Sequence, residues 1–309
     1  GAEQPSVPFI LGVVNQRNYK SAEEIAEIEK ACVVTADMHL AAMRTVRPGI
    51  RESEVAAVVA EAAFKHNYEL SFPIIATVNG QTLHNHDHSN LIKPGDMLLL
   101  DAGAETEMGY AGDMSSTMPA DKKFTQRQRD VYDIQVAAHE AAVAALRPGI
   151  KFVDVYEKSC AVIMEGMKSL GFAKGDPMEA VKAGAHAMFM PCGLGHMMGL
   201  DVHDMENLGE VYVGYNGQPK STQFGRKSLR LGRELEPGFV LTIEPGIYFI
   251  PELIDLWRSE HKFTEFLNYD KLETYKDFSG IRNEEDYLIT EDGARLLGKK
   301  IPLHAEDVE

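Results

Sequence analysis

An α+β fold made of two similar halves is what this sequence predicts, on three observations. Helical stretches occur in pairs, and short apolar segments typical of strands follow each pair. The tetrapeptide that begins at Arg47 recurs at Arg147, each time between two helices. Later in each half, a Pro-Gly turn leads into an apolar strand whose seventh residue after the proline is an acid, Asp101 or Glu244. We infer a duplication about a pseudo-two-fold axis, with one acid from each half in equivalent places.

The predicted elements follow in order from local signals. Ser21 and Glu24 form a capping box that starts a helix, and Pro48 ends it. A second helix is expected at about residues 53–66. In the second half, helices are expected at about 126–146 and 153–170. The strand-like segments are 74–78, 97–101, 115–118, 240–244 and 287–290.

The composition is that of a globular protein. The 309 residues include 31 Lys+Arg and 47 Asp+Glu, a formal net charge of −16, with 44% hydrophobic and 25% charged residues. These values exclude disordered, collagen-like and disulfide-rich classes. Because no low-complexity linker divides the chain, we expect one domain over residues 21–300, with a lead-in over 1–20 and a tail over 301–309. The acidity argues against nucleic acid as a partner, since no basic stripe is present.

The number and spacing of the cysteines and the length of the apolar runs indicate the cellular compartment. The only cysteines are Cys32, Cys160 and Cys192, without a C-x-x-C spacing, which favours a reducing compartment. No apolar run approaches the roughly 18 residues of a membrane helix. We therefore expect a cytoplasmic protein without a membrane partner.

Four acids and one histidine are the candidate metal ligands. Asp101 and Glu244 end very apolar strands, where an ionised carboxylate is costly unless it is paired or bound to a cation. Asp113 is expected on the strand beside that of Asp101, and Glu284 leads into the last strand. His196 is presented from a glycine-rich apolar segment. This oxygen-rich set suits Mn²⁺, and less exclusively Co²⁺ or Zn²⁺, and it is sufficient for two ions.

In the order Asp, Asp, His, Glu, Glu, these residues resemble the motifs of the pita-bread metallopeptidases, which include methionine aminopeptidase, aminopeptidase P and prolidase. The resemblance covers residues 21–297 and implies the pita-bread fold around a curved antiparallel sheet. It also implies two divalent ions, with Asp113 and Glu284 bridging them. Asp101 would complete the shell of one ion, and His196 and Glu244 that of the other.

The resemblance to prolidase is closer still. Residues 227–230 look like the prolidase motif whose arginine, here Arg230, binds the free carboxylate of a dipeptide. A guanidinium suits that role because its planar fork meets a carboxylate with fixed geometry. The alternative for Arg230 is a surface salt bridge. A helical insertion before Gly280 also looks like prolidase.

Further site residues follow from the same resemblance. His84 would line the substrate pocket and take part in catalysis, whereas His86 and His88 are interpreted as solvated loop residues. His203 would contact the scissile carbonyl or move a proton, and Tyr248 is a further pocket candidate.

Four positions complete the sequence-based description of the site. Glu244 would help to move protons in addition to binding metal, and Arg282 would orient ligand carboxylates without touching the metal. Cys192 stands where most relatives have histidine, so a hydrogen bond to the substrate or to a ligand is missing or replaced. Asn283 also departs from the family pattern, with no consequence that the sequence reveals.

The expected function is therefore metal-dependent hydrolysis of Xaa-Pro dipeptides, with the small peptide as the partner. Three alternatives stay open: aminopeptidase P-like cleavage of longer Xaa-Pro peptides, a non-catalytic binding protein of this fold, and metal-free C–N hydrolysis like that of creatinase. A homodimer is also kept open. Prolidases and aminopeptidase P carry a domain before this one, so this chain is either a fragment or a protein that works without that domain.

Overall fold

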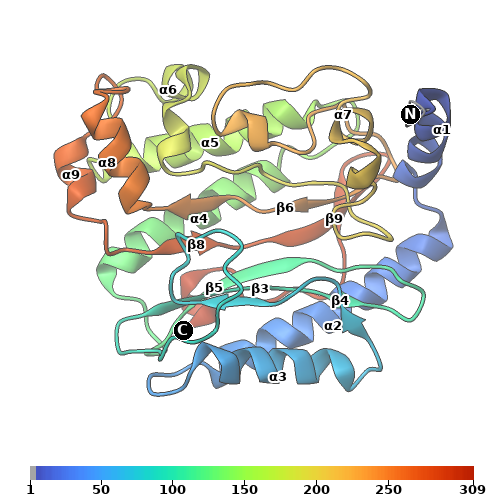
Figure 1. Cartoon of the computed structure of the whole chain (residues 1–309), viewed down its shortest axis with the longest axis horizontal. Helices are drawn as coiled ribbons and strands as arrows, with labels where there is room; N and C mark the ends of the chain where they lie inside the picture. Colours follow the sequence, from blue (N-terminus) through green and yellow to red (C-terminus); the bar gives the residue numbers. More distant parts are fainter. Residues whose placement is uncertain (1–4) are drawn as a thin grey trace.

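The computed structural model describes residues 5–309, and its first half is a helix pair packed on a small antiparallel sheet (Figure 1). The helices are α2 (Ala22–Thr45) and α3 (Glu52–Phe64), which pack on each other. The sheet has the order β2-β3-β5, with bounds Ile75–Thr77, Met97–Ala102 and Met114–Pro119. The capping box of Ser21 and Glu24 is present at the start of α2, as predicted.

The second half repeats this arrangement. Its helices are α4 (Gln126–Val143) and α5 (Phe152–Ser169); in Figure 1, α4 runs behind β6 and β8, and α5 lies above them, away from α2 and α3. Its sheet has the order β10-β9-β6, with bounds Ala294–Leu296, Glu285–Ile289 and Val240–Ile243. The predicted duplicated α+β architecture is confirmed.

The loops that echo each other in sequence also match in structure. Gly49 and Gly149 both adopt left-handed backbone conformations, with φ of 92° and 82°. Their N–H groups donate to the carbonyls of Ile92 and Leu235, each at 2.9 Å. A residue with a Cβ is strained at such φ values, which explains why glycine recurs at this position in both halves.

The two sheets meet at a central seam between β5 and the segment before β9. Ser115 and Glu284 form an antiparallel bridge there, in which the N–H of Glu284 donates to the carbonyl of Ser115 at 3.0 Å. Beside it lies a two-stranded ladder of β7 (Gly246–Tyr248) and β8 (Gly280–Arg282). The seam therefore brings side chains of both halves to the middle of the molecule.

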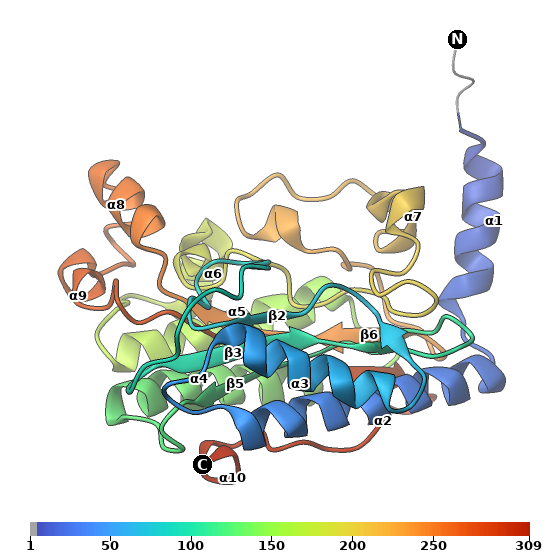
Figure 2. The same ribbon diagram turned by 60° about the horizontal axis from the view of Figure 1, so that its bottom comes forward.

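The remaining elements lie around this centre. They are α1 (Val7–Asn18), β1 (Glu69–Leu70), β4 (Ala104–Glu105), α6 (Pro177–Ala183), α7 (Glu210–Val213), α8 (Pro251–Ser259), α9 (Tyr269–Glu273) and α10 (Ala305–Val308). Short 3₁₀ turns span Ala185–Met188, Glu206–Leu208 and Arg226–Ser228. Helix α1, which the sequence analysis did not predict, projects beyond the rest of the molecule (Figure 2) and contacts α7.

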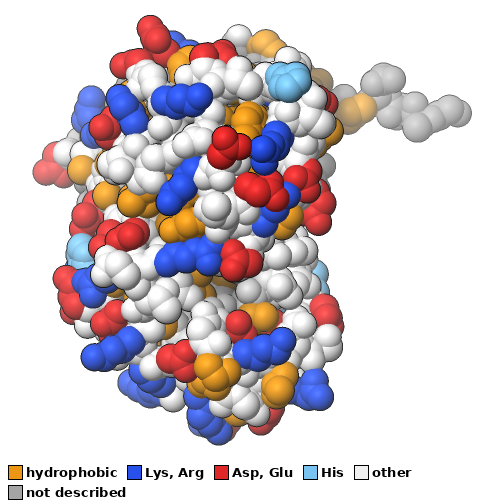
Figure 3. Space-filling view, turned by 90° about the vertical axis from the view of Figure 1, so that its left-hand side faces the viewer, with side chains coloured by type: hydrophobic (Ala, Val, Ile, Leu, Met, Phe, Trp, Pro, Cys, Tyr) orange, Lys and Arg blue, Asp and Glu red, His pale blue; other side chains and the backbone are white. Residues whose placement is uncertain are grey.

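Helices α8 and α9 form the insertion expected before Gly280. On the face that they occupy, basic and acidic side chains are interspersed (Figure 3). Arg258 pairs with Asp270 at 2.9 Å, and Lys276 pairs with Asp255 at 2.5 Å. Within the part of the chain that is described, no helix is both long enough and apolar enough to cross a membrane.

Candidate metal centre

A cavity of about 200 Å³ opens at the seam between the halves. Its walls include all of the residues predicted to bind metal, which are Asp101, Asp113, His196, Glu244 and Glu284. They also include most of the other predicted site residues, which are His84, Cys192, His203, Tyr248 and Arg282. Arg230 is the predicted site residue that does not line this cavity.

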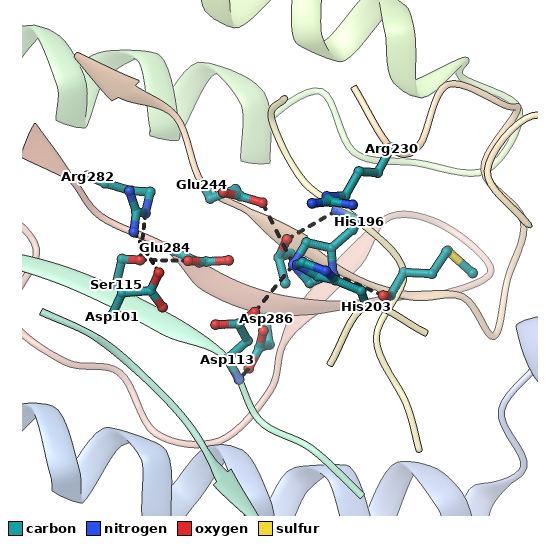
Figure 4. Close-up of polar contacts among 12 residues, drawn as sticks. Asp101, Asp113, Ser115, His196, His203, Arg230, Glu244, Arg282, Glu284 and Asp286 are labelled. Atoms are coloured by element: carbon teal, nitrogen blue, oxygen red, sulfur yellow. Dashed lines mark hydrogen bonds and ion pairs between the residues drawn. The ribbon is translucent and has the colours of Figure 1, made fainter. Parts of the chain in front are cut away.

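Three of these residues, one of them from the first half, converge on a single point. Ligand atoms of Asp113, His196 and Glu284 all lie within 4.8 Å of one another (Figure 4). The Nε2 atom of His196 is 3.3 Å from Oδ2 of Asp113 and 3.7 Å from Oε1 of Glu244. The other ring nitrogen, Nδ1, lies 3.0 Å from the carbonyl of Met197. Donation from Nδ1 to that carbonyl leaves the Nε2 lone pair directed at the carboxylates, as a metal ligand requires.

The carboxylates themselves lack the partners that burial normally demands. The Oδ1 atoms of Asp101 and Asp113 are buried without a hydrogen-bond partner. Burial, together with the neighbouring carboxylates, raises the pKa of Asp113 and of Glu284 well above the usual range. Such a set is unfavourable when ionised and unpaired, and a divalent cation relieves both the repulsion and the missing contacts. The donor set therefore fits the predicted metal.

Arg282 contacts this carboxylate cluster from one side. Its Nη2 donates to Oδ2 of Asp101 at 2.6 Å, its Nε donates to Oγ of Ser115 at 2.8 Å, and its Nη1 donates to the hydroxyl of Tyr248 at 2.9 Å. The hydroxyl of Ser115 in turn donates to Oε2 of Glu284 at 2.7 Å. One buried guanidinium thus orients an acid from each half.

Asp286 belongs to the cluster and was not predicted. Its Oδ2 accepts from the backbone N–H of Asp113 at 3.1 Å and from the thiol of Cys32 at 3.1 Å. Burial raises its pKa to about 7. The two-residue period of a strand could have revealed it, because Asp286 and Glu284 are two positions apart and so share a face.

His203 and Arg230 lie on the other side of the histidine ligand (Figure 4). The ring centroid of His203 is 4.3 Å from that of His196, and its Nδ1 is 3.3 Å from Oε2 of Glu206. Arg230 donates through Nη1 to the Glu206 carboxylate at 2.6 Å and lies 3.3 Å from Glu210. Glu206 therefore joins His203 to Arg230, a connection that the sequence analysis missed.

The loop that carries the histidine-rich motif forms the wall of the cavity. His84 adopts a left-handed conformation with φ of 55°, and burial followed by the charge of Arg282 lowers its pKa. It therefore carries a neutral ring at neutral pH. His86, interpreted from sequence as a solvated loop residue, is exposed and also lines the cavity. Cys192 packs against Tyr248, and burial raises the pKa of its thiol to about 12, so it is a neutral group in the wall.

Comparison with known proteins places this geometry in a family. The model of metallopeptidase family M24 matches residues 26–291. The chain is 34% identical over 302 residues to the Xaa-Pro aminopeptidase of Escherichia coli (strain K12) and 31% identical over 305 residues to the human Xaa-Pro dipeptidase. Each match covers 96% of this chain, which spans only 60% of the length of either relative.

Solved structures agree with these matches. Proline aminopeptidase P II from Yersinia pestis superposes with a TM-score of 0.80 at 33% identity, over 96% of this chain and 61% of that one. Zn-substituted E. coli aminopeptidase P in complex with product gives a TM-score of 0.79 at 34% identity, over 96% and 60% of the two chains. From its sequence, its fold and the arrangement of its buried acids, the chain belongs to metallopeptidase family M24.

Proposed function

We propose that this chain is the catalytic part of a metal-dependent peptidase that hydrolyses Xaa-Pro bonds, preferentially in dipeptides. The observation that carries the proposal is the convergence of Asp113, His196 and Glu284 at the seam, with buried carboxylate oxygens that have no partner. The names of the relatives, Xaa-Pro aminopeptidase and Xaa-Pro dipeptidase, support the substrate class.

In this proposal two divalent ions are held by the predicted ligands. Asp113 and Glu284 would contribute to both ions, Asp101 would serve one of them, and His196 and Glu244 would serve the other. The oxygen-rich donor set favours Mn²⁺, with Co²⁺ or Zn²⁺ as alternatives. Ions of this kind supply an activated water at neutral pH and polarise a carbonyl oxygen.

The other residues of the cavity bind the substrate and move protons. His203 donates through Nδ1 to Glu206, which leaves its Nε2 free to contact the scissile carbonyl or to transfer a proton. Glu244 retains an exposed side-chain fraction of 22%, so its carboxylate can reach a leaving amine. His84 and Tyr248 line the cavity, where they would contact the substrate.

A specific observation favours the second candidate, cleavage of longer Xaa-Pro peptides. Arg230 would bind a dipeptide carboxylate through its guanidinium, and Glu206 and Glu210 already contact Nη1 of this group. A dipeptide carboxylate would compete with Glu206 for Nη1 or bind through the other two nitrogens of Arg230, whereas a longer peptide would leave the ion pair undisturbed.

The test compares Gly-Pro with Gly-Pro-containing tripeptides on protein loaded with Mn²⁺. Faster hydrolysis of the dipeptide, abolished in Arg230→Met, supports the first candidate. Faster hydrolysis of the tripeptide, unchanged in that variant, supports the second. Cleavage of neither substrate contradicts both candidates. If the purified protein holds less than one metal ion per chain, and added Mn²⁺ does not restore metal binding, a non-catalytic or metal-free member of the fold is favoured.

Three further expectations belong to this proposal. We place the catalytic domain in residues 21–300. The free thiols of Cys32, Cys160 and Cys192 fit the reducing conditions of the cytoplasm. A homodimer is proposed as an assembly that sedimentation of the intact chain would detect.

A further inference from the structure

A pair of buried amide side chains lies directly behind the metal centre. Gln135, on α4, is completely buried, and Asn283, between the predicted site residues Arg282 and Glu284, is 4% exposed. The Nδ2 of Asn283 donates to Oε1 of Gln135, so the two amides contact each other across the interface between α4 and the seam.

Each amide also contacts a segment that carries a predicted ligand. The Nε2 of Gln135 donates to the carbonyl of Pro245 at 2.7 Å, directly after Glu244, and it lies 3.3 Å from the backbone carbonyl of Asn283. The Oδ1 of Asn283 accepts the backbone N–H of Thr117 at 3.1 Å, from strand β5 of the first half. Each of the four side-chain amide atoms of this pair therefore has a hydrogen-bond partner within the protein.

We propose that Gln135 and Asn283 are positioning residues that set the separation between Glu244 and Glu284. The inference rests on the proposed role of these two acids as metal ligands. The reason is geometric: one amide is hydrogen-bonded next to Glu244 and next to Glu284 at the same time, and it supplements the ladder pairs Ile243–Glu285 and Gly246–Arg282 that hold the two segments together. Metal sites depend on such outer contacts, because ligands must be held within about 0.5 Å of the productive geometry.

The residue at 283 also explains a departure from the family pattern. An apolar side chain at this position could not accept the N–H of Thr117 or donate to Gln135. In this chain, the side-chain oxygen of Asn283 takes the place of a backbone acceptor for the N–H of Thr117 in β5. This hydrogen bond connects the sheet of the first half to the segment that carries Glu284. The pair thus connects three ligand-bearing segments without touching the metal.

The test measures Mn²⁺ affinity by titration calorimetry, after removal of metal with EDTA. The variants are Gln135→Met, which preserves volume and removes the hydrogen bonds, and Asn283→Leu. Each should weaken Mn²⁺ binding about 10–100-fold, the effect known for residues that orient ligands. Because the two residues act as a unit, the double variant should lose less Mn²⁺ binding free energy than the sum of the losses in the two single variants.

The matched control is Ser159→Ala, which removes a buried hydrogen bond from the hydroxyl of Ser159 to the carbonyl of Ala138 on the outer side of α4. It should lower the melting temperature and leave Mn²⁺ affinity within about twofold. Folded pair variants that bind Mn²⁺ as the parent does would overturn the inference. If Gln135→Met does not fold, Gln135→Glu keeps the acceptor for Asn283 and removes both donated bonds.

A second readout does not depend on metal or activity. Crystal structures of the parent and of a folded variant should differ by more than about 0.5 Å in the separation of Glu244 and Glu284. An unchanged separation contradicts the inference. A parent that binds Mn²⁺ but cleaves no Xaa-Pro peptide contradicts the proposed function and not the positioning role, so the two failures are distinguishable.

Discussion

The two halves present an acid at matched positions, and they hold it differently. Asp101 lies within β3, and its carboxylate is fixed by Arg282 from the opposite half at 2.6 Å. Glu244 lies just beyond β6, and its Oε1 lies 3.7 Å from Nε2 of His196. Its side chain is 22% exposed, compared with 13% for Asp101.

This difference shows how the equivalent acids in the two halves of a duplicated fold can have different functions. The repeated Pro-Gly turn places both acids near the axis, but a guanidinium restrains only the first. A restrained carboxylate suits a ligand, whereas a more mobile and exposed one can also transfer protons. The expected division is metal binding by Asp101 and a mixed role for Glu244.

The largest effects are expected at the seam that both halves share. Asp113→Asn or Glu284→Gln removes a carboxylate of the central cluster, and Mn²⁺ affinity and kcat/KM should each fall by more than about 100-fold, the upper limit for residues that only orient ligands. Calorimetry and steady-state kinetics measure these losses. The melting temperature of the metal-free variants should rise, because the repulsion that raises these pKa values is removed. Unchanged Mn²⁺ binding would show that the seam is not the metal site.

The next effect separates the halves directly. Asp101→Asn should chiefly weaken Mn²⁺ binding, whereas Glu244→Gln should retain more of that affinity and lower kcat about 10²–10⁴-fold at saturating metal. The comparison of kcat at saturation with the Mn²⁺ dissociation constant distinguishes the two roles. Equal patterns in both variants would mean that the halves are equivalent.

A smaller effect is expected when pH changes the folding stability of the metal-free protein. Because burial raises the pKa of Asp113 and of Glu284, the folded protein holds protons that the unfolded chain releases. Stability should therefore fall as pH rises through these raised values. Burial lowers the pKa of His39, His139 and His186 to about 4, which has the opposite effect, but only below about 6.5.

Between about pH 7 and about pH 8 the raised carboxylates decide the slope, because the cysteine thiols, whose pKa burial also raises, release protons in the unfolded chain only near about 8.5. Thermal unfolding in EDTA should show a melting temperature that decreases from about pH 7 upward, and Mn²⁺ should remove the decrease. Glu284→Gln is the matched control, and it should flatten the slope without metal. A melting temperature that rises over this range would contradict the assignment.

The smallest effect tests whether the halves unfold together. Gly49→Ala and Gly149→Ala place a Cβ at left-handed positions without a steric clash, since no atom lies closer than 4.0 Å. Each substitution should lower the free energy of unfolding by about 1 kcal/mol because of backbone strain alone. In one cooperative unit, chemical denaturation should show equal losses that add in the double variant. Two separate transitions would show instead that each half unfolds by itself.

The sequence revealed the parts of the site that depend on local pattern. Asp101 and Glu244 were recognisable because the same turn and strand precede both, and each ends in an acid that an apolar strand does not normally tolerate. The duplicated architecture followed from the same signals. Helix ends differed by a few residues; for example, α4 ends at Val143 because the following residues form the turn before the repeated Pro-Gly.

What escaped prediction depends on contacts between distant segments. Glu206 meets Arg230 and His203 in a segment with little regular structure, and no spacing rule indicates such a contact. The pairing of Gln135 with Asn283 joins positions 148 residues apart. Helix α1 has apolar residues without a clear amphipathic stripe, so periodicity gave no signal for it.

The bridge between Ser115 and Glu284 has a consequence for the lifetime of the protein. A cation shared by Asp113 and Glu284 would act as a cross-link between the halves, closing a long stretch of chain into a loop. Such a closure restricts the unfolded ensemble, and a ligand bound only by the folded state stabilises that state by mass action. Loss of metal would therefore do more than stop turnover. It would weaken the seam and expose the chain to proteolysis.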